Sequence, residues 1–298
     1  MADKYILHMV TPLKHMSPFD VNMAVDAGCD AVITHTDVSL GEIAGLVQDA
    51  IFSRPPKTGA RTGMFFGGKN AVLALDMMAQ AKTALVPPFG LSLFADPAGS
   101  FTTAAALVAC VEKTLREKKN RDLRGRKVAV FGATGVVGFS AGVIAALEGA
   151  EVVLVGYDGI RRVGDAAKEI KARFGADVAP ADGSDDAKKA SILANAEVVL
   201  SAGRAGVRVL SKAQLEAARN LILAADVNAV PPSGIEGLEA NAKDTPLTSA
   251  GALGIGPLAI GGIKYKTEAG LFQKLIAATK PVHFDFRDAF ALARELNA

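Results

Sequence analysis

Short apolar runs alternate with longer amphipathic stretches along most of the chain. In the first third, four apolar runs have the length and composition of β-strands: residues 5–10, 31–34, 61–66 and 91–95. The segments after them have the apolar spacing of helices: residues 19–27, 40–51, 71–85 and 102–119. Strands that are separated by helices predict a parallel sheet.

The second half repeats this alternation more strongly. Strands are predicted at residues 127–131, 151–155, 177–179, 197–201 and 221–225. Helices are predicted near residues 136–148, 161–173, 187–193 and 212–218. After Pro231 and Pro232 comes a glycine-rich segment, followed by predicted helices at about 262–278 and 287–296. The pattern indicates a second parallel sheet with helices on both faces.

A charged stretch at residues 116–127 separates the two halves and places a domain boundary near Leu123. We therefore expect an α/β protein of two domains: an N-terminal α/β substrate domain at 1–122 and a Rossmann-type, doubly wound parallel-sheet domain at 123–270. The remaining residues, 271–298, are expected to form a helical segment that packs back on the N-terminal domain.

Composition narrows the class of protein. The chain has 298 residues, a formal net charge of +2 and no Trp, with no basic run that would favour a nucleic-acid partner. Its two cysteines, and an N-terminus without a signal-peptide pattern, favour the cytoplasm. Residues 128–147 are uncharged, but their glycines indicate a buried strand, turn and helix rather than a membrane span. His8, His15 and His35 lack metal-ligand spacing, so we predict no metal site.

The strand predicted at 127–131 runs directly into Gly132-Ala-Thr-Gly135-Val-Val-Gly138 and then into an Ala-rich helix. Such glycines permit a tight turn, a close approach of the backbone to a pyrophosphate, and close helix–sheet packing. The amide groups of the helix start would bind the phosphates. We predict an NAD or NADP site that includes Gly132, Thr134, Gly135, Val136, Val137 and Gly138. The alternative is that these glycines serve packing alone.

The residues after the second strand of this domain choose between NAD and NADP, because an acid binds the ribose 2′-hydroxyl whereas arginine accommodates a 2′-phosphate. The chain offers both, in Asp158, Arg161 and Arg162. We therefore expect poor discrimination between the two cofactors. The ends of the next two strands should flank the nicotinamide; their candidate cofactor-binding residues are Ser201, Ala202, Gly203, Asp226 and Asn228.

Substrate choice falls to the N-terminal domain, whose polar residues near strand ends are the candidates. The predicted substrate-binding residues are Lys14, His15, Phe19, Asp20, Asp96, Ser100, Thr102 and Thr103; Thr36, Asp37, Lys69 and Asn70 occupy similar places. Structural alternatives stay open: Ser17 and Asp20 as helix caps, Asp96 as a turn residue, and Phe19 as a core residue.

The glycine-dense segment from Gly251 to Gly262 precedes Lys264 and Lys266. So many glycines indicate backbone close to a ligand or at a domain junction. On a helix the two lysines would point about 200° apart, so we expect one of them to face the substrate, and we choose Lys264 as the catalytic candidate.

Several of these segments resemble the methylene-tetrahydromethanopterin dehydrogenases of methylotrophic bacteria. They are LHMVTPLKHMSPFD at 7–20, FGGKN at 66–70, DPAGSFTT at 96–103, DVNAVPP at 226–232 and GIGPLAIGGIKYK at 254–266. The resemblance implies oxidation of a pterin-bound methylene group to methenyl in formaldehyde oxidation, with NAD or NADP as acceptor. It also implies a homo-oligomer and a fold similar to methylene-tetrahydrofolate dehydrogenase/cyclohydrolases.

A sister group in the same bacteria prefers NADP and also accepts the tetrahydrofolate carrier. Its pattern has a basic residue where this chain has Tyr157, which argues against strict use of NADP. Lys264 matches a lysine that lies at the pterin in that group.

Hydride leaves a carbon held between two nitrogens, so no proton has to be removed and no general base is required. We expect catalysis by positioning, with the reacting carbons about 3–3.5 Å apart, and Lys264 directed at a pterin oxygen. The alternatives are a methylene-tetrahydrofolate dehydrogenase, a shikimate-type two-domain dehydrogenase, and a dinucleotide sensor without turnover.

Overall fold

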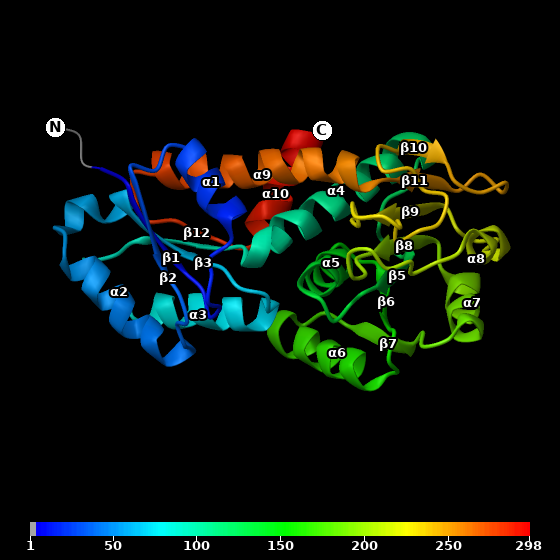
Figure 1. Ribbon diagram of the computed structural model, residues 1–298, viewed down its shortest axis with the longest axis horizontal. Coiled ribbons are helices and arrows are strands. Elements are labelled where there is room, and N and C mark those ends of the chain that lie inside the picture. The colour runs from blue at the N-terminus through cyan, green and yellow to red at the C-terminus, as the bar shows by residue number, and fades with distance from the viewer. Residues whose placement is uncertain (1–3) are drawn as a thin grey trace. The chain divides into compact units, whose positions relative to one another are not determined.

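A computed structural model describes residues 4–298 (Figure 1). The chain divides into two compact units, one formed by residues up to Thr102 together with Tyr265–Leu292, the other by Thr103–Lys264 and Ala293–Ala298. All three changes of unit fall within helices, α4 (Ser100–Lys119), α9 (Pro257–Ala277) and α10 (Phe286–Asn297). The domain boundaries predicted at 122/123 and 270/271 do not coincide with these changes of unit, and the extent of whole domains stays a prediction.

The first unit contains a five-stranded, entirely parallel sheet in the order β12-β4-β3-β1-β2. Its strands are β1 (Ile6–Val10), β2 (Ala31–His35), β3 (Thr62–Phe66), β4 (Ser92–Ala95) and β12 (His283–Phe284). The connecting helices are α1 (Pro18–Asp26), η1 (Leu40–Glu42), α2 (Ile43–Phe52), η2 (Pro56–Arg61), α3 (Ala71–Thr83) and η3 (Pro97–Gly99). The parallel sheet predicted for the first third is confirmed.

The C-terminal part of α9 packs against this sheet through an aromatic cluster. Phe272 lies 5.6 Å from Phe65 and 5.1 Å from Phe94, measured between ring centroids. Phe286, at the start of α10 (Phe286–Asn297), lies 5.5 Å from Phe101. All five rings are fully buried, and burial of each contributes about 1.5–3 kcal/mol. Strand β12, which alternation did not reveal, joins the same sheet by pairing with β4.

The second unit contains a seven-stranded sheet in the order β10-β11-β9-β8-β5-β6-β7, parallel except for β10 (Figure 1). The strands are β5 (Lys127–Phe131), β6 (Glu151–Gly156), β7 (Val178–Asp182), β8 (Val198–Ser201), β9 (Leu223–Asp226), β10 (Lys243–Pro246) and β11 (Leu253–Ile255). The chain runs outward from β5 through β6 to β7 and then returns to β8 beside β5. That reversal of direction creates the topological switch point of a Rossmann sheet.

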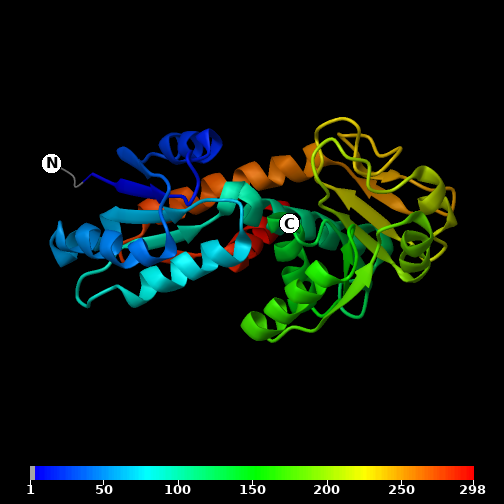
Figure 2. The ribbon, with the colours of Figure 1, turned by 60° about the horizontal axis from the view of Figure 1, so that its bottom comes forward.

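Helices cover both faces of this second sheet. They are α5 (Val136–Leu147), α6 (Arg161–Phe174), α7 (Asp186–Asn195) and α8 (Lys212–Ala217). Figure 2 shows α5 and α6 beside β6 and β7. Side chains of β6 alternate between faces, with Leu154 close to Gly142 of α5 and Val155 in the core that includes Leu193 of α7. The doubly wound arrangement predicted for this half is confirmed.

Hydrophobic patterning placed most elements within a few residues of their observed ends, and it missed the short strands β10, β11 and β12. Residues 128–147 form β5, a tight turn and α5, as predicted. Within residues 4–298, no helix combines the length and the apolar character needed to cross a bilayer.

Candidate functional site

The turn between β5 and α5 requires glycine at two positions for packing. Gly132 has φ of +76°, and a Cβ built on it would lie 2.1 Å from the carbonyl oxygen of Ala202. A Cβ on Gly138 would lie 2.3 Å from the carbonyl oxygen of Gly132. Any larger residue would force backbone to move at either place, so these two glycines bring β8, the turn and α5 into close contact.

Gly135 differs from its neighbours, because a Cβ there would require only a small local adjustment of the backbone. Its φ of −79° suits any residue, and a Cβ there would meet only the carbonyl oxygen of Gly132, at 3.3 Å. Gly135 is the N-cap of α5 and supplies no capping side chain. The amide groups at the start of α5 therefore remain available to an anion.

A pocket of about 560 Å³ opens beside this turn, within the size range of cofactor sites. It is lined by Phe131, Gly132, Thr134, Gly135, Val155, Tyr157, Arg162, Gly183, Lys189, Ala202, Gly203, Arg204, Val207, Arg208 and Val209. The pocket combines apolar walls, a glycine at the helix start and several cations. These residues fit a dinucleotide whose pyrophosphate lies at α5, with Gly135 leaving room where a Cβ would intrude.

Two of the predicted cofactor residues after β6, Asp158 and Arg162, pair with each other, and Arg162 also lines this pocket. Arg162 Nη1 lies 3.1 Å from Asp158 Oδ2 and donates a hydrogen bond of 3.1 Å to the Tyr157 hydroxyl. The Arg162 guanidinium carbon also lies 5.8 Å from the centroid of the Tyr157 ring. The hydrogen bond to Asp158 raises the pKa of Arg162, which stays cationic. Arg161 is exposed and does not line the pocket.

The residues at the ends of β8 and β9 are more buried than a direct ligand would need to be. Ser201 and Asp226 are fully buried in register with each other, and Asn228 is nearly so. The Asp226 carboxylate accepts hydrogen bonds from the backbone amides of Asn228 and Ile235, each at 3.2 Å. Burial raises the pKa of Asp226 despite these hydrogen bonds. Asp226 thus anchors the loop that follows β9, and its contact with a cofactor stays a prediction.

Sequence patterns did not reveal several cations of the pocket. Lys189 donates to the carbonyl of Val209 at 3.0 Å, and Arg208 pairs with Glu236 at 2.8 Å. Arg204 follows Ala202 and Gly203, whose backbone abuts Gly132. Within residues 4–298 the Arg204 side chain has no hydrogen-bond or ion-pair partner, which leaves it as an uncompensated charge. Its place three residues after a strand end was the available signal.

In the first unit, a strand-end carboxylate holds the start of α4. Asp96 is fully buried and accepts hydrogen bonds from the Phe101 amide at 2.7 Å and the Thr102 hydroxyl at 2.6 Å. Asp96 therefore fixes a helix start, which extends its predicted role as a turn residue. Ser100 and Thr103 flank this position and are half-buried.

Helix α1 presents predicted substrate residues in contrasting environments. Ser17 caps the helix by accepting from the Asp20 amide at 3.3 Å, as predicted. Phe19 is 46% exposed, so the alternative that it is a core residue is wrong, whereas Asp20 is 1% exposed. Lys14 and His15, before the helix, are both exposed.

The candidate catalytic lysine lies within α9, which begins earlier than predicted. Lys264 is half-buried and Lys266 is exposed, and the choice of Lys264 stays a prediction. Glu268 lies one helical turn beyond Lys264 on the same face of the helix, and both Glu268 and Thr267 are fully buried. Neither residue was predicted from the sequence.

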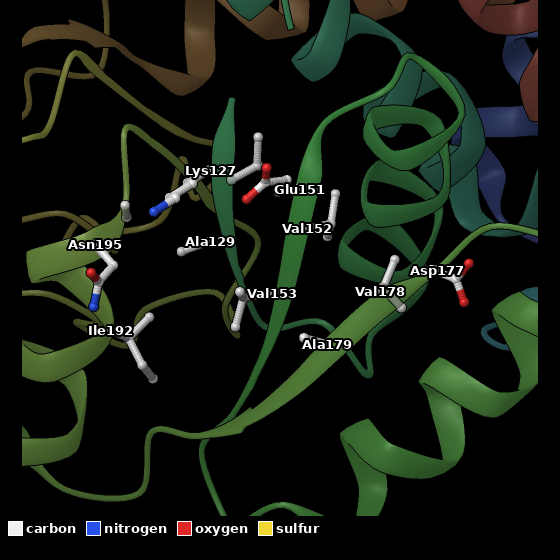
Figure 3. Close-up of a pocket in the computed structure, with 12 residues that line it drawn as sticks. Lys127, Ala129, Glu151, Val152, Val153, Asp177, Val178, Ala179, Ile192 and Asn195 are labelled. Atoms are coloured by element: carbon white, nitrogen blue, oxygen red, sulfur yellow. The ribbon is translucent and has the colours of Figure 1, made fainter. Parts of the chain in front are cut away.

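A second hollow of about 510 Å³ lies near the amino ends of β5, β6 and β7 (Figure 3). Ala129, Val153 and Ala179 form its apolar floor, with Ile192 of α7 at its side. It lacks a glycine turn and a helix N-terminus, so it does not share the phosphate-binding features of the first pocket. Residues 4–298 also contain no group of three His, Cys, Asp or Glu side chains placed to hold a metal.

Comparison with known proteins adds two kinds of finding. Solved structures share only the fold: an NAD-dependent malic enzyme from Thermotoga maritima has a TM-score of 0.58 at 13% identity, covering 97% of this chain and 84% of that one. A shikimate 5-dehydrogenase from Listeria monocytogenes, solved with shikimate and NAD, has a TM-score of 0.51 at 15% identity, covering 92% and 93%.

Sequence relatives are much closer. A family model described as methylene-tetrahydromethanopterin dehydrogenase, N-terminal, matches residues 18–98. The NAD(P)-dependent methylenetetrahydromethanopterin dehydrogenase of Methylorubrum extorquens is 53% identical over 291 residues, covering 98% of both chains. The Bifunctional protein MdtA of the same organism is 33% identical, covering 94% of both. The chain therefore belongs to the methylene-tetrahydromethanopterin dehydrogenase family.

Proposed function

We propose that this protein is an NAD(P)-dependent dehydrogenase that transfers a hydride from methylene-tetrahydromethanopterin to NAD or NADP and produces methenyl-tetrahydromethanopterin. The observation that carries the proposal is 53% identity over nearly the whole length of a relative named for this activity. The glycine-framed pocket at the switch point of the second sheet supports it independently. The reaction belongs to one-carbon metabolism, in the oxidation of formaldehyde.

In the second unit, the start of α5 and the turn before it hold the cofactor. Gly135 leaves space for a pyrophosphate, while the amides of Val136, Val137 and Gly138 point at it. Arg204 adds a positive charge beside the same turn. Asp226 fixes the loop after β9 and so shapes the nicotinamide end. The nicotinamide supplies the hydride acceptor when it is bound.

In the first unit, exposed groups contact the pterin and a buried carboxylate positions the residues beside it. Phe19 offers an exposed ring for stacking, and Lys14 and His15 offer exposed hydrogen-bond donors. Asp96 acts through position, because it fixes Thr102 and the start of α4. Asp20, Ser100 and Thr103 complete this proposed set.

The reaction requires placement rather than proton transfer. The carbon that loses hydride becomes part of a cation delocalised over two nitrogens, so no base has to act. Lys264 orients the pterin through an oxygen, since an ammonium group beside the forming cation would be unfavourable. Holding the reactants in a near-attack geometry supplies most of the rate enhancement.

The test is an absorbance assay of nicotinamide reduction with purified protein. Methylene-tetrahydromethanopterin and methylene-tetrahydrofolate are compared, each with NAD and with NADP. Reduction with the methanopterin substrate is the expected result. If nicotinamide is reduced only with the folate substrate, the proposed substrate is wrong. Cofactor binding without nicotinamide reduction in the presence of either substrate would favour a sensor. Analytical ultracentrifugation tests the further expectation of a homo-oligomer.

A further inference from the structure

Three side chains after β6 form a compact charged cluster at the rim of the dinucleotide pocket. Arg162 and Tyr157 line the pocket, whereas Asp158 does not. Arg162 joins the three residues: it pairs with Asp158 at 3.1 Å, donates to the Tyr157 hydroxyl at 3.1 Å and lies over the Tyr157 ring. The acid and the base that usually distinguish NAD from NADP are thus bound to each other.

The electrostatics of this cluster differ from those of a committed NAD or NADP site. An unpaired acid at this position accepts hydrogen bonds from the ribose hydroxyls and repels a 2′-phosphate, whereas an unpaired arginine attracts the phosphate. Here the Asp158 charge is compensated by Arg162, so the paired cluster opposes neither cofactor. The side chains are 38% and 45% exposed, and a solvent-exposed ion pair of this kind changes an equilibrium constant by about fivefold at most. A phosphate can therefore displace Asp158 at little cost.

We infer that Arg162 is the residue through which this protein accepts NADP as well as NAD. Asp158 and the Tyr157 ring hold Arg162 in place until a 2′-phosphate binds it. With NAD, the Arg162–Asp158 pair stays closed. With NADP, Arg162 leaves Asp158 and binds the 2′-phosphate, with the Tyr157 ring still supporting its guanidinium. This inference rests on the proposed function only in requiring that a nicotinamide dinucleotide occupies the pocket.

Other cations of the pocket are less suited to this task. Lys189 belongs to α7 and Arg208 to the segment between β8 and α8, so neither lies in the loop that follows β6. Arg204 belongs to the loop whose backbone abuts Gly132, so its charge serves the pyrophosphate that both cofactors share. Among the cations that line the pocket in the described part of the chain, Arg162 alone follows β6, the strand after which the 2′-phosphate is read.

Direct binding of NAD and NADP, measured by isothermal titration calorimetry without substrate, tests the inference. Arg162→Gln should weaken NADP by about 10–100-fold, the range for loss of a charged hydrogen bond, and change NAD by less than about threefold. Asp158→Asn should shift the ratio the opposite way, because it releases Arg162 and removes a negative charge near the phosphate. Arg162→Lys should retain part of the NADP affinity, since it keeps the charge but loses the planar fork.

Arg173→Gln is the matched control, because Arg173 lies on the same helix, pairs with Glu169 four residues away and does not line the pocket. It should leave both affinities unchanged. Equal loss of both cofactors in Arg162→Gln, or no loss of either, would overturn the inference while leaving the proposed function intact. Wild-type protein that binds neither NAD nor NADP would overturn both.

Discussion

A substitution at Gly135 distinguishes a turn that binds a ligand from a turn that serves packing alone. Gly132 and Gly138 cannot make this distinction, because packing requires glycine at both positions whether or not a ligand binds. The φ of −79° at Gly135 is ordinary, and a Cβ there would contact only one backbone oxygen, at 3.3 Å. Gly135→Ala should therefore fold normally. The added methyl group would occupy the pocket at the start of α5, where we place the pyrophosphate, so both cofactors should bind more weakly.

The structure sets the expected magnitudes. Alanine is a poorer N-cap than glycine by about 0.5–1 kcal/mol, and it gains about 0.4–1 kcal/mol by restricting the unfolded chain, so stability should change by less than about 1 kcal/mol. Displacement of the phosphate should weaken binding about 100-fold, or about 2.8 kcal/mol. Gly138→Ala is the contrasting variant: its Cβ would lie 2.3 Å from a backbone oxygen, and overpacking of this kind costs about 1–3 kcal/mol of stability.

Thermal unfolding followed by circular dichroism, without cofactor, measures the stability of each variant, and calorimetric titration measures binding. The expected pattern is weak binding with normal stability in Gly135→Ala, and reduced stability in Gly138→Ala. Wild-type affinity in Gly135→Ala would refute the ligand role of the turn and leave packing as its function. An unfolding midpoint lowered as far as that of Gly138→Ala would refute the expectation that the start of α5 tolerates a Cβ at residue 135.

Three further predictions test other parts of the molecule. Lys264→Met should lower kcat by about 10²–10³ through lost positioning, and an unchanged kcat would remove Lys264 from the site. Arg204→Gln should weaken NAD and NADP equally, by about 10-fold or more, as measured by calorimetry; selective loss of one cofactor would contradict its assignment to the pyrophosphate. Burial lowers the pKa of His8, with a smaller effect from His35. The contribution of His8 to the free energy of unfolding is therefore fully present above the unfolded-state pKa of about 6.5, and it is lost as the pH falls below that value. His8→Gln should reduce the decrease in unfolding midpoint between about pH 7 and pH 5, and an unaltered decrease would contradict this origin.

The sequence was sufficient for the architecture because alternating strands and helices leave few ways to bury their apolar faces. It missed β12, whose two residues are too few to display alternation and which is stabilised by pairing with β4. It also started α9 late, because glycines at 261 and 262 suggested a loop although Pro257 opens the helix. Long-range pairing decided the first case and leaves no local pattern, whereas the second has a local signal in Pro257 that the glycines obscured.

Site residues could be predicted from the sequence where the backbone geometry requires one residue type. They were harder to predict where their role depends on the side-chain contacts that form in the folded protein. Gly132 and Gly138 are required by close backbone contacts, so the motif identifies them. Arg204 could not be distinguished from other surface arginines by spacing, since its significance lies in the absence of a partner within residues 4–298. The pairing of Arg162 with Asp158 likewise depends on rotamers and on the turn between β6 and α6, which brings the two side chains together.

The buried carboxylates at strand ends clarify why this fold can serve a reaction that needs no base. Asp96 accepts hydrogen bonds from the start of α4, and Asp226 accepts them from the loop after β9. A carboxylate that accepts hydrogen bonds from backbone amides is an effective anchor for the loop to which they belong. Hydride transfer demands fixed distances more than a titrating group, and both carboxylates contribute rigidity where the chain leaves its strands. Their proposed contribution to the rate is therefore made through the loops they position.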